Sequence, residues 1–172
     1  MGSAVDKIIH ITPTFAVTSA LAPEDFATVA ALGFKTVISN RLDGEEAGQL
    51  PARVEAAHAW RHGLKFAHVP ADKLELFTDP VVEGMADTIR AADGPVLAHC
   101  KSGLRSVIVW AAASARSQPV DCVLAALAAA GFDLDILRDD LDRQADRRRW
   151  IGAVAPALDC GCGAQVAELE AA

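Results

Sequence analysis

The chain has 172 residues, of which 52% are hydrophobic and 23% are charged, a composition that fits a globular protein and excludes a disordered one. Its formal net charge is −7 at pH 7 and its isoelectric point is near 5.1, which argues against a protein that binds nucleic acid through the phosphate backbone. The length predicts one domain over residues 1–150, followed by a C-terminal tail over residues 151–172.

The longest uncharged apolar stretches, residues 107–115 and 123–132, are about half as long as a helix that spans a bilayer. The N-terminal sequence MGSAVDKIIH lacks both the basic start and the apolar run of a secretory signal. We therefore expect a cytoplasmic protein that has neither a membrane nor a nucleic acid as its partner.

In chain order, two short strands are predicted first, at residues 8–11 and 15–18. Pro23 then opens a helix that Gly33 ends, because proline favours the first turn of a helix and glycine its end. The apolar run at residues 36–39 predicts a buried strand.

A polar loop over residues 40–48 leads to a predicted helix over 51–62, which is followed by a strand over 65–69. Asp79 and Pro80 supply an N-cap and a first helical residue, so we expect a third helix from there to about residue 92. The next apolar run predicts a strand over residues 95–99.

The last predicted elements are helices over residues 107–117 and 119–130, and a charged surface helix over 133–150 with an expected ion pair between Asp139 and Arg143. Strands that alternate with helices of this length form right-handed crossovers and a mostly parallel sheet covered on both faces. The predicted fold class is therefore α/β, with a short, mainly parallel central sheet flanked by helices.

Residues 99–106, with the sequence HCKSGLRS, carry the most information about chemistry because they join an apolar strand to an Ala-rich helix. The carboxyl end of a strand that leads into a helix offers free N–H groups and the positive end of a helix dipole, which together bind anions. A thiol placed there ionises more easily, and Lys101 and Arg105 add positive charge. Cys100 is therefore the candidate nucleophile, and the alternative interpretation is a buried structural thiol.

We expect the residues that follow Cys100 to bind the anion, and these are Lys101, Ser102, Gly103, Leu104, Arg105 and Ser106. Gly103 allows a turn close to the ligand, Arg105 presents a planar fork of donors, and the Ser106 hydroxyl can donate a hydrogen bond to the thiolate. His99 is expected to support the loop by bonding backbone carbonyls rather than to transfer protons.

The sequence HCKSGLRS, preceded by PVLA, resembles the active-site loop of the cysteine-dependent phosphatases. Within that superfamily the chain is similar to the bacterial beta-lactamase hydrolase-like family of dual-specificity-phosphatase-like domains. Residues 37–45, which include Asn40 and Asp43, also resemble this family, and the similarity covers about residues 7–117. It implies the cysteine-phosphatase fold, with Asn40 and Asp43 supporting the loop, and a possible partner enzyme of sulfur metabolism, since such domains also occur fused to enzymes of that kind.

One departure from the phosphatase pattern changes the expected function. Only four residues separate Cys100 from Arg105, one fewer than in the phosphatases that the loop resembles, and a shorter loop has fewer amides to surround a phosphate dianion. Rhodanese-type sulfurtransferases use a loop of this shorter length. The leading hypothesis is therefore a sulfurtransferase that carries sulfane sulfur as a persulfide on Cys100.

Two other functions stay open. The alternative is a phosphatase that acts through a cysteinyl-phosphate, with Asp72 as the general acid and Asp43 as the second candidate for that role. The third is a non-catalytic module that binds an anion or a phosphopeptide. All three hypotheses imply a small anionic substrate or ligand, such as thiosulfate, a persulfide or phosphate.

No cofactor and no metal are expected. His58 and His62 share one face of a predicted helix but lack further ligands, so we interpret them as surface residues. Cys160 and Cys162 lie in the tail, where they are either incidental thiols or a pair that could resolve a persulfide or bind a soft metal, although two ligands alone do not make a metal site. The sequence leaves the oligomeric state open.

Overall fold

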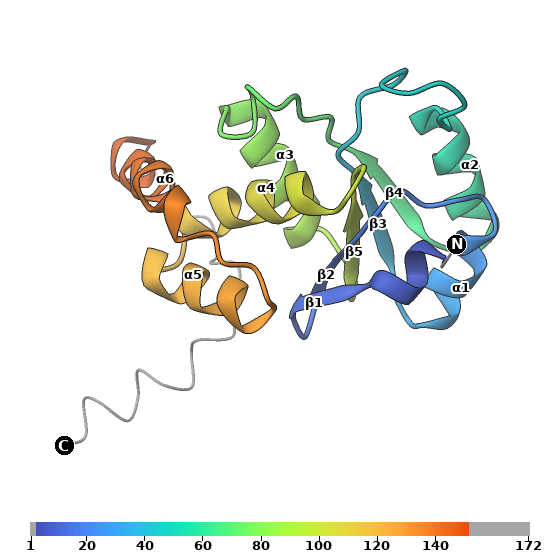
Figure 1. The fold of residues 1–172 in the computed structure, drawn as a ribbon, viewed down its shortest axis with the longest axis horizontal. Helices are drawn as coiled ribbons and strands as arrows, with labels where there is room; N and C mark the ends of the chain where they lie inside the picture. Colours follow the sequence, from blue (N-terminus) through green and yellow to red (C-terminus); the bar gives the residue numbers. More distant parts are fainter. Residues whose placement is uncertain (1–2, 152–172) are drawn as a thin grey trace.

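The computed structural model describes residues 3–151, which form an α/β fold around one five-stranded sheet (Figure 1). The strands are β1 Ile9–Thr12, β2 Phe15–Thr18, β3 Thr36–Ser39, β4 Lys65–His68 and β5 Val96–His99. Their order across the sheet is β1-β2-β5-β3-β4, and only β1 runs antiparallel to its neighbour. The predicted fold class and each of the predicted strands are confirmed.

Helices cover both faces of the sheet, as the crossover rule predicts (Figure 1). On one face lie α1 and α2, and on the other α3, α4, α5 and α6. Their bounds are α1 Asp25–Ala31, α2 Ala52–Arg61, α3 Asp79–Arg90, α4 Leu104–Ala115, α5 Val120–Ala129 and α6 Arg138–Ile151, and two short 3₁₀ helices, η1 and η2, span Ala4–Lys7 and Asp135–Leu137.

The core that holds α4 in place lies between this helix and the sheet. Trp110 of α4 is buried, and its ring stacks on Phe15 of β2 with the centroids 5.7 Å apart. Val107 and Ala111, one helical turn apart, are also buried. Because this face of α4 is fixed against the sheet, the start of the helix is fixed at the carboxyl end of β5.

β5 is the central strand, and its last residue sets the position of the loop that follows. His99 is level with Thr18 on β2 and with Ser39 on β3. The N–H of Asn40 extends the pairing by donating to the His99 carbonyl at 2.9 Å. The residues after His99 therefore leave the sheet at the edge where parallel α/β sheets bind ligands.

The helix after the loop begins at Leu104, three residues earlier than the prediction. Gly103 has a φ of +91° and occupies the N-cap position, so the chain can turn directly from the loop into the helix. Arg105 and Ser106, which the sequence placed in a loop, therefore belong to the first helical turn.

The charged C-terminal helix α6 is not the solvated surface helix that we expected. Leu141 and Gln144 are buried, and Gln144 accepts a hydrogen bond from Arg116, the residue that caps α4, at 2.9 Å. Arg143 pairs with Asp140 at 2.6 Å instead of with Asp139. The helix is a packed part of the domain because one of its faces meets α4 and α5.

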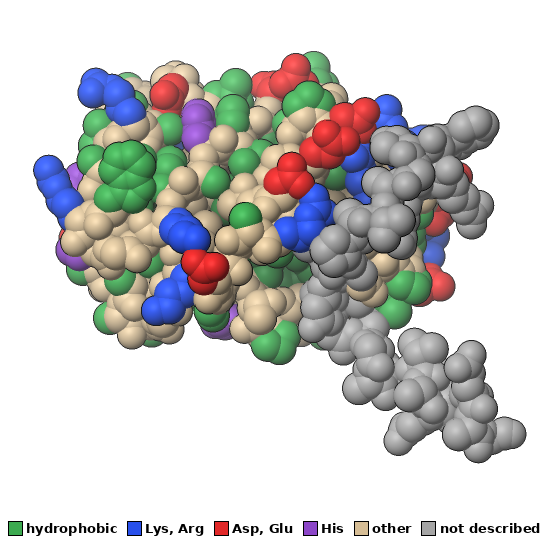
Figure 2. All heavy atoms as spheres, turned by 180° about the vertical axis from the view of Figure 1, so that it is seen from behind, with side chains coloured by type: hydrophobic (Ala, Val, Ile, Leu, Met, Phe, Trp, Pro, Cys, Tyr) green, Lys and Arg blue, Asp and Glu red, His purple; other side chains and the backbone are tan. Residues whose placement is uncertain are grey.

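None of the described helices is both long and apolar enough to cross a bilayer. On the face shown in Figure 2, basic side chains are scattered among acidic and hydrophobic ones rather than gathered in one patch. The predicted tail with Cys160 and Cys162 lies outside the described residues.

Candidate active site

Cys100 follows β5 directly and is almost completely buried, with 1% of its surface exposed. Its sulfur accepts a hydrogen bond from the backbone N–H of Gly103 at 3.1 Å. An N–H donor at a helix N-terminus stabilises a negatively charged sulfur more than a neutral one. The position therefore suits a nucleophilic thiolate, although a role for Cys100 in catalysis stays a prediction.

Gly103 makes this geometry possible for two reasons. Its φ of +91° is in the left-handed region, which residues with a Cβ rarely adopt. A Cβ at this position would also lie 3.2 Å from the carbonyl oxygen of Thr18. Glycine is thus required both for the turn into α4 and for close packing of the loop against β2.

The start of α4 supplies backbone donors to the site. The first N–H groups of a helix have no intrahelical acceptor, and in α4 these belong to Leu104, Arg105 and Ser106. The positive end of the helix dipole adds to their attraction for an anion. The start of α4 is therefore a suitable place for an anion to bind.

The guanidinium of Arg105 is held by a carboxylate that the sequence analysis did not single out. Nη1 and Nη2 donate to the two oxygens of Glu45 at 2.5 and 2.7 Å, and Nη1 also donates to the Ala71 carbonyl at 2.9 Å. Such a bidentate pair fixes the plane of the guanidinium. Glu45 and Ala71 do not use the Nε–H and the second Nη2–H, and the guanidinium also interacts with the Cys100 sulfur, so this remaining edge could donate to an oxyanion bound beside the thiol.

The ion pair between Glu45 and Arg105 shifts the pKa of both side chains. The hydrogen bond from Arg105 lowers the pKa of Glu45 to about 2, against partial burial. The same bond raises the pKa of Arg105, burial opposes this rise, and the nearby Cys100 sulfur adds to it. Since the carboxyl pKa is depressed by folding, the pair stabilises the fold fully above the ordinary value of 4.5 and loses this contribution as the pH falls through about 2.

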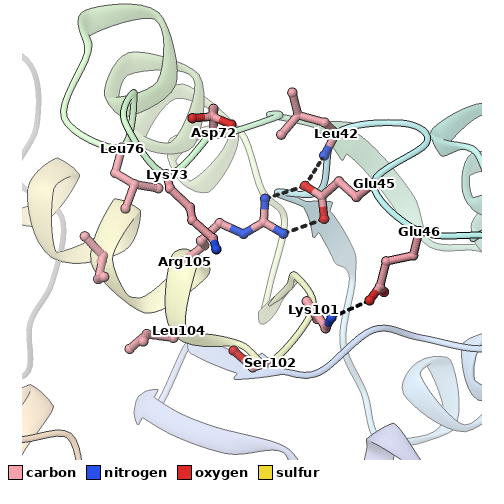
Figure 3. A pocket seen from close by; sticks show the side chains of 11 residues that line it. Leu42, Glu45, Glu46, Asp72, Lys73, Leu76, Lys101, Ser102, Leu104 and Arg105 are labelled. Carbon is pink, nitrogen blue, oxygen red and sulfur yellow. Dashed lines mark hydrogen bonds and ion pairs between the residues drawn. The ribbon is translucent and has the colours of Figure 1, made fainter.

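Lys101 lies at the mouth of the site rather than inside it. Its side chain is 68% exposed, and its ammonium pairs with Glu46 (Figure 3). The pairing lowers the pKa of Glu46. Lys101 therefore faces a carboxylate in this structure, whereas we expected it to bind the anion directly.

The two candidate general acids are in different positions. Asp72, in the loop after β4, lines the same cavity as Arg105, and one of its oxygens accepts a hydrogen bond from Leu74 N–H at 3.0 Å (Figure 3). Asp43 accepts from the N–H of Ala52 at 2.7 Å and so caps the start of α2. Of the two candidate general acids, only Asp72 lines the cavity, whereas Asp43 supports the start of α2 instead of the Cys100 loop.

Three polar residues are buried behind the loop. Asn40 donates from its side chain to the Val69 carbonyl at 2.8 Å, which ties the end of β3 to the end of β4 and agrees with a supporting role. Contrary to expectation, His99 makes no side-chain hydrogen bond to a described carbonyl, and its Nε2 lies 3.5 Å from a carboxylate oxygen of Glu55. The expected bond from Ser106 to the thiol is also not formed, since its hydroxyl has no partner among the described residues.

A cavity of about 820 Å³ opens in front of the loop (Figure 3). Charged side chains from three segments, including Glu45, Asp72 and Arg105, form one part of its lining, and Leu76, Leu104 and Ile108 form another. Ser102 lines this cavity and also a smaller one of about 410 Å³. The lining is suited to a small anion that carries an apolar organic group.

In the described residues, no group of three or more His, Cys, Asp and Glu side chains could hold a metal ion. His58 and His62 lie at the end of α2 without such further ligands.

Glu45 is the last residue of the segment that resembles a phosphatase family and Glu46 follows it, so the resemblance could have drawn attention to both. Glu55 is different, because a glutamate in the first turn of a polar helix is typically exposed to solvent. No sequence signal marks it.

A cysteine at the end of the central strand and an arginine in the first turn of the following helix define an α/β protein with a cysteine-containing loop suited to an anion. A protein-family comparison matches residues 7–117 to the family described as "Beta-lactamase hydrolase-like protein, phosphatase-like domain". The chain belongs to this family.

The curated relatives support the same assignment. The chain is 33% identical over 141 residues to the beta-lactamase hydrolase-like protein of Xylella fastidiosa strain Temecula1, and 30% identical over 104 residues to that of Agrobacterium fabrum. These matches cover 81% and 60% of the chain, but only 32% and 24% of the relatives. The chain therefore spans about a third of the length of the Xylella protein.

Solved structures agree with the fold. A protein from Neisseria meningitidis Z2491, named a "putative phosphatase", is 30% identical, with a TM-score of 0.68 over 80% of this chain and 97% of that one. A protein of the DUF442 family from Shewanella putrefaciens, with the same name, is 14% identical, with a TM-score of 0.61 over 84% of this chain and 90% of that one, and shows the fold alone. The comparisons favour the phosphatase interpretation over the sulfurtransferase that we expected from the loop length.

Proposed function

We propose that this domain is a cysteine-dependent phosphatase that hydrolyses phosphomonoesters through a cysteinyl-phosphate. The observation that carries the proposal is the arrangement of donors around Cys100. The first N–H groups of α4 and the remaining edge of the Arg105 guanidinium lie beside a thiol that already accepts a hydrogen bond from Gly103. Donors in this number suit the several oxygens of a phosphoryl group.

The proposed reaction has two steps. The Cys100 thiolate attacks phosphorus, the bond from phosphorus to the ester oxygen breaks, and that oxygen takes a proton from Asp72. A water molecule then attacks the cysteinyl-phosphate and gives a proton to Asp72, which releases inorganic phosphate and restores the thiolate. Arg105 and the α4 amides stabilise the oxygens that stay on phosphorus in both steps.

The start of α4 at Leu104 bears on the preference for sulfur transfer. Four residues still separate Cys100 from Arg105, but the N–H groups of Leu104 and Arg105 have no intrahelical acceptor and can donate to the oxygens of a phosphoryl group. Asp72 in the cavity also supports phosphoryl transfer, because an ester oxygen needs a proton on leaving whereas sulfite does not.

The cavity lining suggests which phosphomonoesters fit. Leu76 and Leu104 lie on the side of the cavity opposite Glu46 and Lys101 (Figure 3), and Ile108 also lines the cavity. Burial of apolar surface against such a wall contributes roughly 25 cal/mol per Å². The proposed substrates are therefore phosphomonoesters with an apolar organic group next to the ester oxygen.

The experiment that tests the proposal compares two donors on the full chain. After brief incubation with 4-nitrophenyl phosphate or with thiosulfate, the protein is acid-quenched, and the tryptic peptide 91–101, bounded by cleavage after Arg90 and Lys101, is weighed. Phosphate release with a phosphoryl group on this peptide supports the proposal. A sulfur atom gained from thiosulfate, without phosphate release, would establish sulfur transfer instead. If neither adduct forms and no phosphate is released, the proposal is overturned in favour of a module without turnover.

Replacing Asp72 with asparagine should lower kcat by about a hundredfold for phenyl phosphate, whose leaving group needs a proton. The loss should be below about tenfold for 4-nitrophenyl phosphate, whose leaving group departs as a stable anion. The measurement is kcat for both esters. Asp43→Asn is the matched control, because asparagine can still accept the α2 N–H and this residue does not line the cavity. Equal losses for both esters would remove Asp72 from the role of general acid.

A further inference from the structure

Among the buried aspartate, glutamate, lysine and arginine side chains of the described residues, Glu55 is the least exposed, and it has no role in the proposed reaction. This residue lies in the first turn of α2 and is 2% exposed. Its Oε2 atom lies 3.5 Å from Nε2 of His99, whose side chain is fully buried. The pair therefore lies in the interior, next to the residue that carries the nucleophilic sulfur.

Burying the Glu55 carboxylate lowers the stability of the fold unless another interaction offsets the cost. Removing a carboxylate from water costs several kcal/mol unless a partner offsets it. In the part of the chain that the structure describes, His99 is the only cationic or imidazole side chain within 4.0 Å of the Glu55 carboxylate. An apolar residue would fill this position in the α2 interface at a lower cost, as Ala59 does one turn later.

The backbone and the side chain of His99 are held by different elements. The sheet fixes the backbone, through the pairing with β2 and β3 and through the bond from Asn40 to the His99 carbonyl. The side chain has no hydrogen bond to any described group, and its contact with a charged group is the 3.5 Å separation between Nε2 and the Glu55 carboxylate. A carboxylate opposite Nε2 favours a proton on that nitrogen and thereby sets the tautomer of the imidazole.

We propose that Glu55 is a positioning residue for the nucleophile: its buried carboxylate holds the His99 imidazole, and this ring in turn fixes Cys100 beneath the donors of α4. Glu55 acts from the face of the sheet that α2 covers. Arg105, which interacts with the Cys100 sulfur, and its partner Glu45 belong to other segments. The inference needs a reactive Cys100, as the proposed function does, but it does not depend on the substrate.

The test uses Glu55→Gln, which keeps the shape of the side chain and removes its charge. We expect the rate of alkylation of Cys100 by iodoacetamide, followed in the tryptic peptide 91–101, to fall about tenfold at neutral pH. For 4-nitrophenyl phosphate we expect kcat to fall by about ten- to hundredfold with KM nearly unchanged, because Glu55 touches no substrate while a small displacement of the sulfur slows attack. Cys122, in another tryptic peptide, reports the general reactivity of thiols in the same sample.

Two further variants separate positioning from a general loss of structure. Glu83→Gln changes a partly exposed glutamate on α3 and should leave both rates unchanged. His99→Gln should slow alkylation about as much as Glu55→Gln, and the double variant should be no slower than either single one, because both act through one pair. If Glu55→Gln does not fold, the same loss in a folded His99→Gln still supports the proposal.

The outcomes also separate this inference from the proposed function. Slower alkylation in a protein that hydrolyses no phosphomonoester would support the role of Glu55 and overturn the phosphatase. Hydrolysis with unchanged alkylation and kcat in Glu55→Gln, or fully additive losses in the double variant, would overturn the role of Glu55 and leave the phosphatase standing. An unchanged rate of Cys100 alkylation in a folded His99→Gln variant would also overturn the role of Glu55.

Discussion

Replacing Cys100 with serine is expected to lower kcat for 4-nitrophenyl phosphate by at least about 10⁴-fold, a loss typical of removing a nucleophile. A serine hydroxyl stays protonated at neutral pH, and the donors around this position, the Gly103 N–H and the Arg105 guanidinium, cannot accept its proton. The measurement is steady-state phosphate release together with the search for a phosphoryl adduct on peptide 91–101. The adduct should be absent from the variant.

The serine variant should still bind its ligand, because the Arg105 fork and the α4 amides remain. Titration with inorganic phosphate should therefore give a dissociation constant within about threefold of that of the unchanged chain. The matched control is Cys122→Ser, since Cys122 is a half-buried cysteine on α5, away from the loop, and this variant should keep full activity. Retention of more than a tenth of the activity by Cys100→Ser would remove Cys100 from the role of nucleophile.

Replacing Arg105 with lysine should lower kcat/KM by about 10²- to 10³-fold, although the positive charge is kept. The reason is geometric. Arg105 binds both oxygens of Glu45 with one edge and leaves a second edge for the phosphoryl oxygens, whereas an ammonium is a point charge that cannot serve both. We also expect weaker binding of inorganic phosphate, measured by calorimetry.

The matched control for this substitution is Arg143→Lys. Arg143 is an exposed residue of α6 that pairs with Asp140, so the control should be indistinguishable from the unchanged chain. The melting temperature of each variant shows whether a loss of activity follows a loss of fold. A folded Arg105→Lys that keeps kcat/KM within about threefold would show that the two-edge geometry of the guanidinium does not matter for the reaction.

The elements of the fold were predictable because their signals are local. Short β-branched and apolar runs predicted each strand, for example Thr36–Ser39, with its predicted bounds. The start of α4 was less predictable. Gly103 can either continue a loop or cap a helix, and only packing of the loop against the Thr18 carbonyl decides between these.

The exposure of α6 was also decided by packing. Its many charged residues predicted a solvated helix, but Leu141 and Gln144 are enough to bury one face against α4 and α5. A short apolar stripe among charges carries little weight in a sequence pattern, although it determines where the helix lies.

By itself, the sequence determined the α/β class and the position of the Cys100 loop between a strand and a helix, because adjacent residues and periodic apolar patterns specify these. Only the tertiary structure decided which carboxylates serve the loop. Glu45 lies 60 residues from Arg105 in sequence, and Glu55 reaches His99 across the interface of α2 with the sheet. A charged residue has the same letter in the sequence whether its side chain is solvated or paired with another residue. Only the packing of distant segments determines which of these two environments the side chain has.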